Sequence, residues 1–453
     1  MRRWIAVILL ASLGLAQSPP ALSVEQSLAL LQQSPSWRAA DLGVLGAQRN
    51  LSLAQSAAGL NLLAGAEQTL GRDATNGITF RGSNFSATLA TNVLPWSPAQ
   101  DNIRAAQRAL DRAVWQRDET RNTLVLGLVE RYFGVRTARF DLALAEGARA
   151  LAERRLQIVS SQATLGQVRQ DAILNAQLSL QEALTRERQA RSGLEITRRA
   201  LETLLGRPLG GNNLSSPPPQ PSAPEALETL LRRALERRPD ILRAVSSLQD
   251  AQDGLDIARR DRWLPEATLQ TFYGEFSSSG SQAGPQVAAN LNFKSGDLAL
   301  SASTPAFADP NPNDPNNPRA NRLGLRLSLS VPLVFPSNDA RTQAAGAGLE
   351  AAQSGLELAR LQAELEVRQR FGELSDAEAQ RDQVSAGLEA ASERLRVARA
   401  RLESGLGTRV EVEAAELGVH QAEREVFATA VSIYLAALRL EVAAGNNIPG
   451  GIQ

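Results

Sequence analysis

The chain contains two copies of one long sequence pattern, and this duplication limits the folds that it can adopt. The first matches share an offset of 204 residues, and later matches, such as Phe133-Gly134 with Phe371-Gly372 and Gly166 with Gly405, share offsets of 238 and 239. The change of offset places an insertion of roughly 35 residues in the second copy, between Leu264 and about Asp339. Two structural repeats are expected. The residues that recur at the first offset are Pro35, Ala40, Ala47, Gln48, Leu51, Ala54 and Leu60.

Composition argues against a large globular core. Aromatic residues make up 4% of the 453 residues, and there is no cysteine. Such a chain, rich in Ala and Leu with mixed charges, is typical of long helices packed along narrow seams. The 48 basic and 48 acidic residues balance and are interspersed. No basic stripe indicates a nucleic-acid partner.

The N-terminal residues 1–16 have the pattern of a secretory signal peptide. Arg2 and Arg3 precede an apolar run from Trp4 to Leu15, and small residues follow at the expected cleavage site. No later run of 18 apolar residues was found that would favour a membrane-spanning helix. The mature chain is therefore expected outside the cytoplasm, without disulfides.

The first repeat, residues 17–205, alternates between helical and strand patterns. After a helix interrupted at Pro35, a period of two residues predicts a β-hairpin over about 61–94. Ser97-Pro98 then begins a helix that we expect to run over 97–165, on the order of 100 Å at about 1.5 Å per residue. A return helix is predicted over 169–205. Such a rod is too long for the core of a compact domain.

The second repeat, residues 225–444, follows a proline-rich linker at 206–224 and has the same order. We predict a broken helix, strands at about 266–276 and 321–334, a long helix at 337–404 and a return helix at 408–444. Residues 445–453 are expected to be a flexible C-terminus.

The strand after Asn321 has the clearest alternation in the chain. One face carries apolar side chains and the other carries Arg322, Arg326, Ser328 and Ser330. The insertion, residues 277–320, contains a further hairpin pattern around Ser295-Gly296. The pattern does not decide whether this hairpin joins the sheet or forms a projecting loop. The apolar face, predicted to meet lipid, consists of Leu323, Leu325, Leu327, Leu329 and Val331.

Strands of about 9 to 11 residues with one apolar and one polar face, in an exported chain, favour a transmembrane β-barrel. Four such strands cannot close a barrel alone, because the smallest barrels have about eight. We therefore expect several copies to assemble, with the long helices continuing the barrel as a helical tube.

The mature chain resembles the TolC family of outer-membrane efflux proteins over its whole length. The resemblance rests on the duplicated order of elements, the breaks at Pro35 and Pro239, and two turn stretches, 166–177 and 405–416. It implies a mainly α fold with membrane β structure: a homotrimer with four strands per subunit in an outer-membrane β-barrel and a trimeric α-barrel in the periplasm. It further implies a passive exit duct that works with a periplasmic adaptor and an inner-membrane pump, in tripartite efflux or type I secretion.

The resemblance also assigns roles to residues at the two helical turns. Gly166, Gly405, Gly407 and Thr408 match the turns that contact the adaptor. Asp171 and Arg409 match charges that hold the periplasmic mouth closed. The family can also use a tyrosine before the second turn, and this chain has Ser404 there.

Other functional classes have weaker support. The single histidine, His420, lies in a helical stretch, and there is no cysteine nucleophile, metal-spaced cluster or phosphate-binding glycine loop, so we expect no enzyme activity, catalytic residue, metal or cofactor. A periplasmic adaptor or an exported structural coiled coil is the alternative. The transported substrate stays open, because a wide duct imposes little selectivity.

Overall fold

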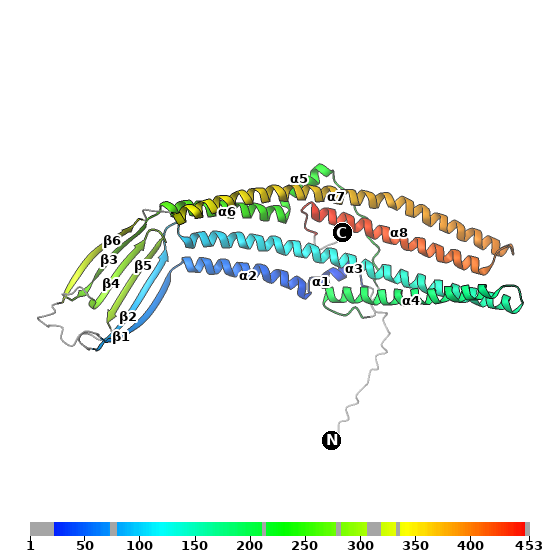
Figure 1. Ribbon diagram of the computed structural model, residues 1–453, viewed down its shortest axis with the longest axis horizontal. Helices are drawn as coiled ribbons and strands as arrows, with labels where there is room; N and C mark the ends of the chain where they lie inside the picture. The colour runs from blue at the N-terminus through cyan, green and yellow to red at the C-terminus, as the bar shows by residue number, and fades with distance from the viewer. Residues whose placement is uncertain are drawn as a thin grey trace, which may run out of the picture. The chain divides into compact units, whose positions relative to one another are not determined.

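The computed structural model describes residues 22–72, 79–210, 214–277, 282–305, 319–331 and 336–448. The predicted signal peptide therefore lies outside the described residues. The helices are α1 (Val24–Leu31), α2 (Pro35–Ala58), α3 (Pro98–Thr164), α4 (Gln170–Leu205), α5 (Leu227–Arg237), α6 (Pro239–Trp263), α7 (Pro336–Glu403) and α8 (Arg409–Ala443). The strands are β1 (Asn61–Arg72), β2 (Thr79–Asn92), β3 (Glu266–Phe276), β4 (Gln282–Asn292), β5 (Asp297–Pro305) and β6 (Ala320–Ser330) (Figure 1).

The chain divides into two compact units, and the division falls within α2, α3 and α7. The helical unit comprises residues up to 40, 118–238 and 361 onwards. The sheet unit comprises 41–117 and 239–360. Each unit thus contains segments from both sequence repeats, as expected if the repeats lie along each other rather than forming separate domains.

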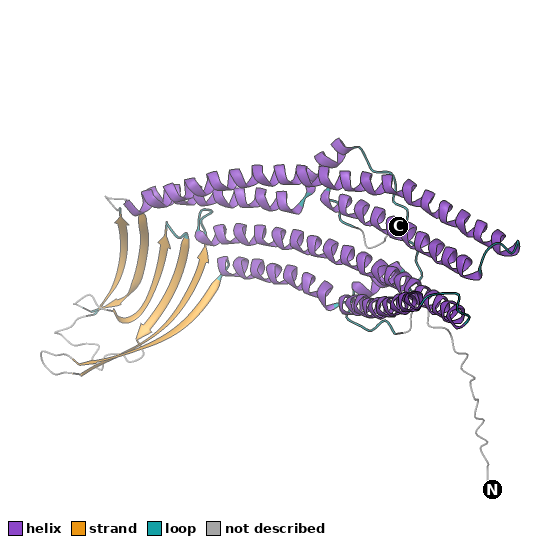
Figure 2. Ribbon diagram, turned by 45° about the vertical axis from the view of Figure 1, so that its right-hand side comes forward, coloured by secondary structure: helices purple, strands orange, loops and turns teal. Residues whose placement is uncertain are grey.

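The described strands of the sheet unit form one antiparallel sheet in the order β1-β2-β5-β4-β3-β6 (Figure 2). The predicted count of four strands per subunit is therefore wrong, because the insertion contributes β4 and β5 to the same sheet. These strands pair with β3 and β2, so the inserted hairpin lies between the hairpin of the first repeat and the strands of the second. The turn between β4 and β5 is possible because Gly296 adopts a φ of +74°.

Ion pairs join the helices of the sheet unit. Arg108 of α3 contacts Asp250 of α6 at 2.5 Å and Asp253 at 2.8 Å, and Arg260 of α6 lies 3.0 Å from Asp101. Figures 1 and 2 both show α2 beside α3 and α6 beside α7 in this unit. The helix order is thus α2-α3-α6-α7.

The apolar core lies in the helical unit. Its largest cluster combines α1, α3 and α4 with the linker residues Leu209 and Leu214. Tyr132 of α3 is fully buried there, and its hydroxyl donates to the carbonyl of Leu22 at 2.7 Å and accepts from the N–H of Ser216 at 3.1 Å. One tyrosine thereby fixes both the N-terminal segment and the linker to α3. A second cluster joins α5, α7 and α8.

In both repeats a glycine after the return helix lies against the helix break at Pro35 or Pro239. Gly206 ends α4 with a φ of +69°, and a Cβ atom there would lie 2.9 Å from Cδ of Pro35. Gly445 follows α8 with a φ of +82°, and a Cβ atom would lie 3.1 Å from the backbone nitrogen of Arg238. In each repeat, the end of the return helix contacts the break near the start of the same repeat. Left-handed backbone and close approach both require glycine there.

Part of the C-terminal segment predicted to be flexible contacts α3. The N–H of Ile448 donates to Oδ1 of Asn122 at 3.0 Å, and the side chains of Asn122 and Asn447 are hydrogen-bonded at 3.3 Å. Asn122 is buried on α3, so it needs such partners. Residues 449–453 lie outside the described part of the chain.

Among the described helices, α8 alone is long and apolar enough to cross a membrane by length and composition. Its apolar positions Ile433, Tyr434 and Leu440 are buried in the two core clusters. Packing within the helical unit therefore accounts for this apolar character.

Candidate functional site

The sheet has one apolar face that continues across all six strands. Residues that are directly opposite one another in the register lie on the same face. One row on this face consists of Leu325, Thr271, Ala289, Leu300, Leu89 and Leu62. A second row consists of Leu323, Tyr273, Val287, Ala302, Ala87 and Ala64. No described element covers the large side chains here, since Leu62, Val287, Leu300, Leu323 and Leu325 are all exposed.

The opposite face is mainly polar. A row next to the first apolar row consists of Arg326, Gln270, Asn290, Ala299, Ala90 and Asn61, whereas the row between the two apolar rows consists of Gly324, Phe272, Ala288, Ser301, Thr88 and Leu63. Phe272 and Leu63 are apolar exceptions on this face. Phe272 lies over Gly324 of β6, where its ring fills the space that a side chain would occupy. A sheet with these two faces suits an interface between lipid and water.

Four of the five residues predicted to meet lipid lie on β6, and all five are exposed. All are between 53% and 80% exposed, and the leucines share one face of β6. Val331 follows the last residue of β6 and lies outside the strand. Their contact with lipid stays a prediction.

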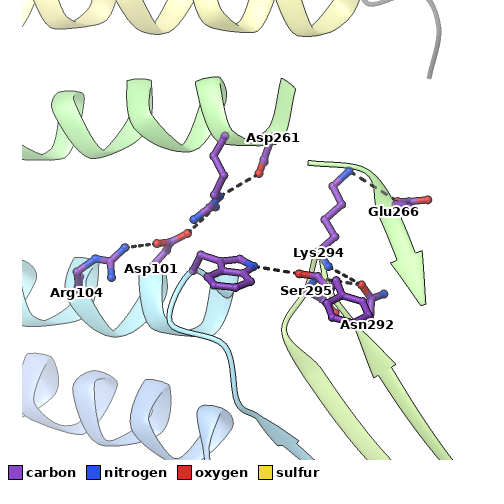
Figure 3. Close-up of polar contacts among 10 residues, drawn as sticks. Asp101, Arg104, Asp261, Glu266, Asn292, Lys294 and Ser295 are labelled. Atoms are coloured by element: carbon purple, nitrogen blue, oxygen red, sulfur yellow. Dashed lines mark hydrogen bonds and ion pairs between the residues drawn. The ribbon is translucent and has the colours of Figure 1, made fainter. Parts of the chain in front are cut away.

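The turn of the inserted hairpin is fixed to the junction between β2 and α3 (Figure 3). The indole N–H of Trp96 donates to the carbonyl of Phe293 at 3.0 Å, and the N–H of Val93 donates to the carbonyl of Gly296 at 2.9 Å. Within the turn, Oδ1 of Asn292 accepts from the backbone N–H groups of residues 294 and 295. The sequence analysis missed this contact, because nothing local marks Trp96 as the partner of a turn about 200 residues away.

The turn between α7 and α8 contains three of the predicted residues. Gly405 has a φ of +74°. At Gly407 a Cβ atom would lie 2.9 Å from Cβ of Arg401, so the chain passes too close for a larger residue. Thr408 caps α8: its hydroxyl accepts from the N–H of Glu411 at 3.3 Å, and the carboxylate of Glu411 accepts from the N–H of Thr408 at 3.2 Å.

Arg409, the first residue of α8, has an 80% exposed side chain, and its Nε lies 3.3 Å from Oε1 of Glu413. Glu413 also pairs with Arg154 of α3. The structure thus gives Arg409 a partner within its own chain, which the sequence analysis missed although the spacing of four residues could have indicated it.

The turn between α3 and α4 contains the other predicted residues. Gly166 has a φ of +70°. Asp171 is exposed in the first turn of α4, and its Oδ1 accepts from the N–H of Ala172 at 3.1 Å. Among the described residues no ion pair joins Asp171 to Arg409, so a role for them in one gate stays a prediction.

The charges along the α3–α6 seam act as a network. Partial burial acts to raise the pKa of Asp250, but hydrogen bonds from Arg112 and Arg108 outweigh it, so the pKa lies below its usual range. The carboxylate therefore keeps its charge over the whole physiological range. The spacing of Arg108 and Arg112, and of Asp250 and Asp253, places each pair on one helix face, and that is the signal that sequence reasoning could have used.

A groove of about 470 Å³ lies between α3 and α8 in the helical unit. Its apolar lining includes Phe140, Leu144 and Leu417. His420, at its edge, is 67% exposed and has Nδ1 3.0 Å from Oε2 of Glu423. The groove is a helix seam with paired charges at its rim.

Residues 230–446 match the sequence model of the family described as outer membrane efflux protein. A search of curated proteins gave no match. The matched segment corresponds to the second repeat.

Solved structures match nearly the whole chain. A structure of CusC has a TM-score of 0.67 at 16% identity, covering 93% of this chain and 92% of that one. VceC of Vibrio cholerae has a TM-score of 0.67 at 16% identity, covering 94% and 96%. The open state of the MtrE outer membrane channel of Neisseria gonorrhoeae has 0.67 at 17% identity, covering 95% and 90%. The second repeat is thus similar to the outer membrane efflux protein family, and the chain as a whole has the fold of these solved channels.

Proposed function

We propose that three copies of this chain form an exit duct in the outer membrane, which conducts substrates passively from a periplasmic adaptor and an inner-membrane pump. The observation that carries the proposal is the two-faced sheet. Its apolar face is uncovered by any described element, and a soluble adaptor would bury such a face in a core. The similarity to outer-membrane channels supports the same conclusion.

Alternating strand directions support closure by several copies. In the order of the sheet, each strand is antiparallel to its neighbour. The two edge strands, β1 and β6, therefore run in opposite directions, and β6 of one copy fits β1 of the next as another antiparallel pair. Any cyclic assembly built this way removes both open edges.

We also infer that the turns around Gly166 and Gly405 form the periplasmic mouth, with Asp171 and Arg409 among the groups that keep it closed. Exposure at the first turns of α4 and α8 makes both charges available to neighbouring copies. In a closed assembly, Arg409 would exchange its contact with Glu413 for one across the mouth. Exposed pairs contribute only about 0 to 1 kcal/mol each, so several copies must act together.

Fractionation of cells tests the location and the rival adaptor function together. The protein should sediment with the outer membrane and require detergent for release. Release by a salt or alkaline wash would instead support an adaptor or an exported coiled coil.

Single-channel recording of Arg409→Ala tests the gate. The open probability should rise, whereas Arg186→Ala, which removes an exposed arginine of α4 that pairs with Glu182, should not change it. An unchanged open probability in Arg409→Ala would end the gate proposal without affecting the duct.

A further inference from the structure

We infer that the inserted hairpin β4–β5 is part of the membrane barrel, so that three copies close 18 strands rather than 12. The inference rests on the proposed duct, because it concerns how wide that duct is where it crosses the membrane. It commits to one partner for the open sheet edges, a second copy of this chain.

The first support is the continuity of the apolar face. Val287 and Ala289 of β4, and Leu300 and Ala302 of β5, lie in the same two rows as the leucines of β6 and β1. A hairpin that projected into water would not need this register. Polar rows of the opposite face also continue across the hairpin, one through Asn290 and another through Gln286 and Ser303.

The second support is the place of the hairpin in the sheet, between the strands that connect to the ion-paired helices α3 and α6. β2 leads into α3 and β3 follows α6, and these helices are ion-paired directly. The two strands are nevertheless separated by β4 and β5. The turn of the hairpin is held by the hydrogen bonds from Trp96 and Val93, which lie just before the start of α3. Figure 3 shows Ser295 of this turn on the same side of the sheet as Asp101 of α3.

The third support is a match of widths. Six strands spaced about 4.8 Å apart and tilted by about 40° cover about 38 Å of a barrel wall. Four helices side by side cover about 32 to 40 Å at axis separations of about 8 to 10 Å. Four strands alone would cover only about 25 Å. With the hairpin included, the sheet of one copy is as wide as its helices α2, α3, α6 and α7.

A wider membrane segment follows for the assembly. Barrel diameter grows roughly in proportion to strand number, so 18 strands give a diameter about 1.5 times that of 12. Barrels of about 16 to 18 strands already leave an aqueous channel. The barrel can then continue the helical tube at the same diameter, without a constriction at the outer membrane.

Single-cysteine variants of the full chain test the inference, because the natural chain has no cysteine. In β4, Val287→Cys and Ala289→Cys should resist a water-soluble maleimide in native outer membranes, whereas Gln286→Cys and Asn290→Cys should react. In β6, Leu325→Cys and Arg326→Cys are the matched controls for the two faces.

Alternation in both strands supports the inference. If β6 alternates but every β4 position reacts, the hairpin lies outside the barrel, and the inference is wrong while the duct stands. If neither strand alternates, the proposed membrane sheet itself is wrong.

A disulfide trap provides a second measurement of the strand order. Thr88 of β2 and Ser301 of β5 are directly opposite in the register. The variant Thr88→Cys/Ser301→Cys should form an intrachain disulfide on mild oxidation, detected as a cross-linked peptide by mass spectrometry. Thr88→Cys/Asn290→Cys, which joins non-adjacent strands, is the control. Failure of the first pair to cross-link in correctly inserted protein would contradict the placement of β5 beside β2.

Discussion

Two buried tyrosines in the same core should respond in opposite ways to loss of their hydroxyl groups. Tyr132 is fully buried and has two hydrogen bonds, to Leu22 and Ser216. Tyr434 is 4% exposed, and among the described residues its hydroxyl has no hydrogen-bond partner. Burial also raises the pKa of Tyr434 to about 12. The first hydroxyl therefore stabilises the fold, whereas the second contributes only its desolvation cost.

The magnitude follows from the partners. Tyr132→Phe removes two hydrogen bonds worth about 1 kcal/mol each, and the carbonyl of Leu22 keeps a weaker partner, the N–H of Ser215 at 3.3 Å. We expect a loss of about 2 kcal/mol, which corresponds to roughly 30-fold faster exchange if the segments open locally. Tyr434→Phe should leave stability unchanged or slightly higher.

Native-state hydrogen exchange with mass spectrometry measures this directly. Peptides that contain Leu22–Leu31 and residues 214–220 should lose protection in Tyr132→Phe and keep it in Tyr434→Phe. Equal loss in both variants, or no loss in Tyr132→Phe, would refute the assignment of the linker anchor to the Tyr132 hydroxyl.

Three further predictions each compare a variant with a control variant. Gly206→Ala should destabilise the helical unit by about 1 to 2 kcal/mol, because a left-handed φ and the contact with Pro35 both disfavour a side chain. Gly193 lies in open space, so Gly193→Ala should instead stabilise the unit by up to about 1 kcal/mol, and thermal melting followed by circular dichroism distinguishes the two variants. The pKa of Asp250 lies below its usual range, so this residue contributes stability that is fully present above its unfolded pKa of about 4 and is lost as the pH falls through the lower folded value. Asp250→Asn should therefore make the melting temperature fall less steeply with decreasing pH on the acid side. An unchanged slope of melting temperature against pH would contradict the network. Leu325→Arg on the apolar face should reduce outer-membrane assembly, because an arginine near the bilayer midplane costs about 2 to 4 kcal/mol. Ser328→Arg on the polar face should assemble normally. Equal assembly of both variants would contradict the assignment of the faces.

Local patterns predicted the individual elements better than their arrangement. The start of the long helix α3 was predicted to within one residue. This was possible because Ser97 and Pro98 define the boundary by local interactions, a capping hydrogen bond and a fixed φ. The alternation in β6 likewise identified its two faces, since the period of a strand is a property of that strand alone.

The strand count and the contacts between repeats could not be predicted in the same way. Whether β4 and β5 join the sheet depends on pairing with β2 and β3, and β2 is about 200 residues away from β5. The Tyr132 anchor depends on partners from two other segments. A gate between Asp171 and Arg409 would depend on neighbouring copies, which a single sequence does not describe.

The most direct test of the account is the recording of ion current through detergent-purified protein in planar bilayers, together with a count of the copies per particle by native mass spectrometry. The account predicts particles of three copies that produce discrete conductance steps. Monomeric particles that insert without conducting would contradict it.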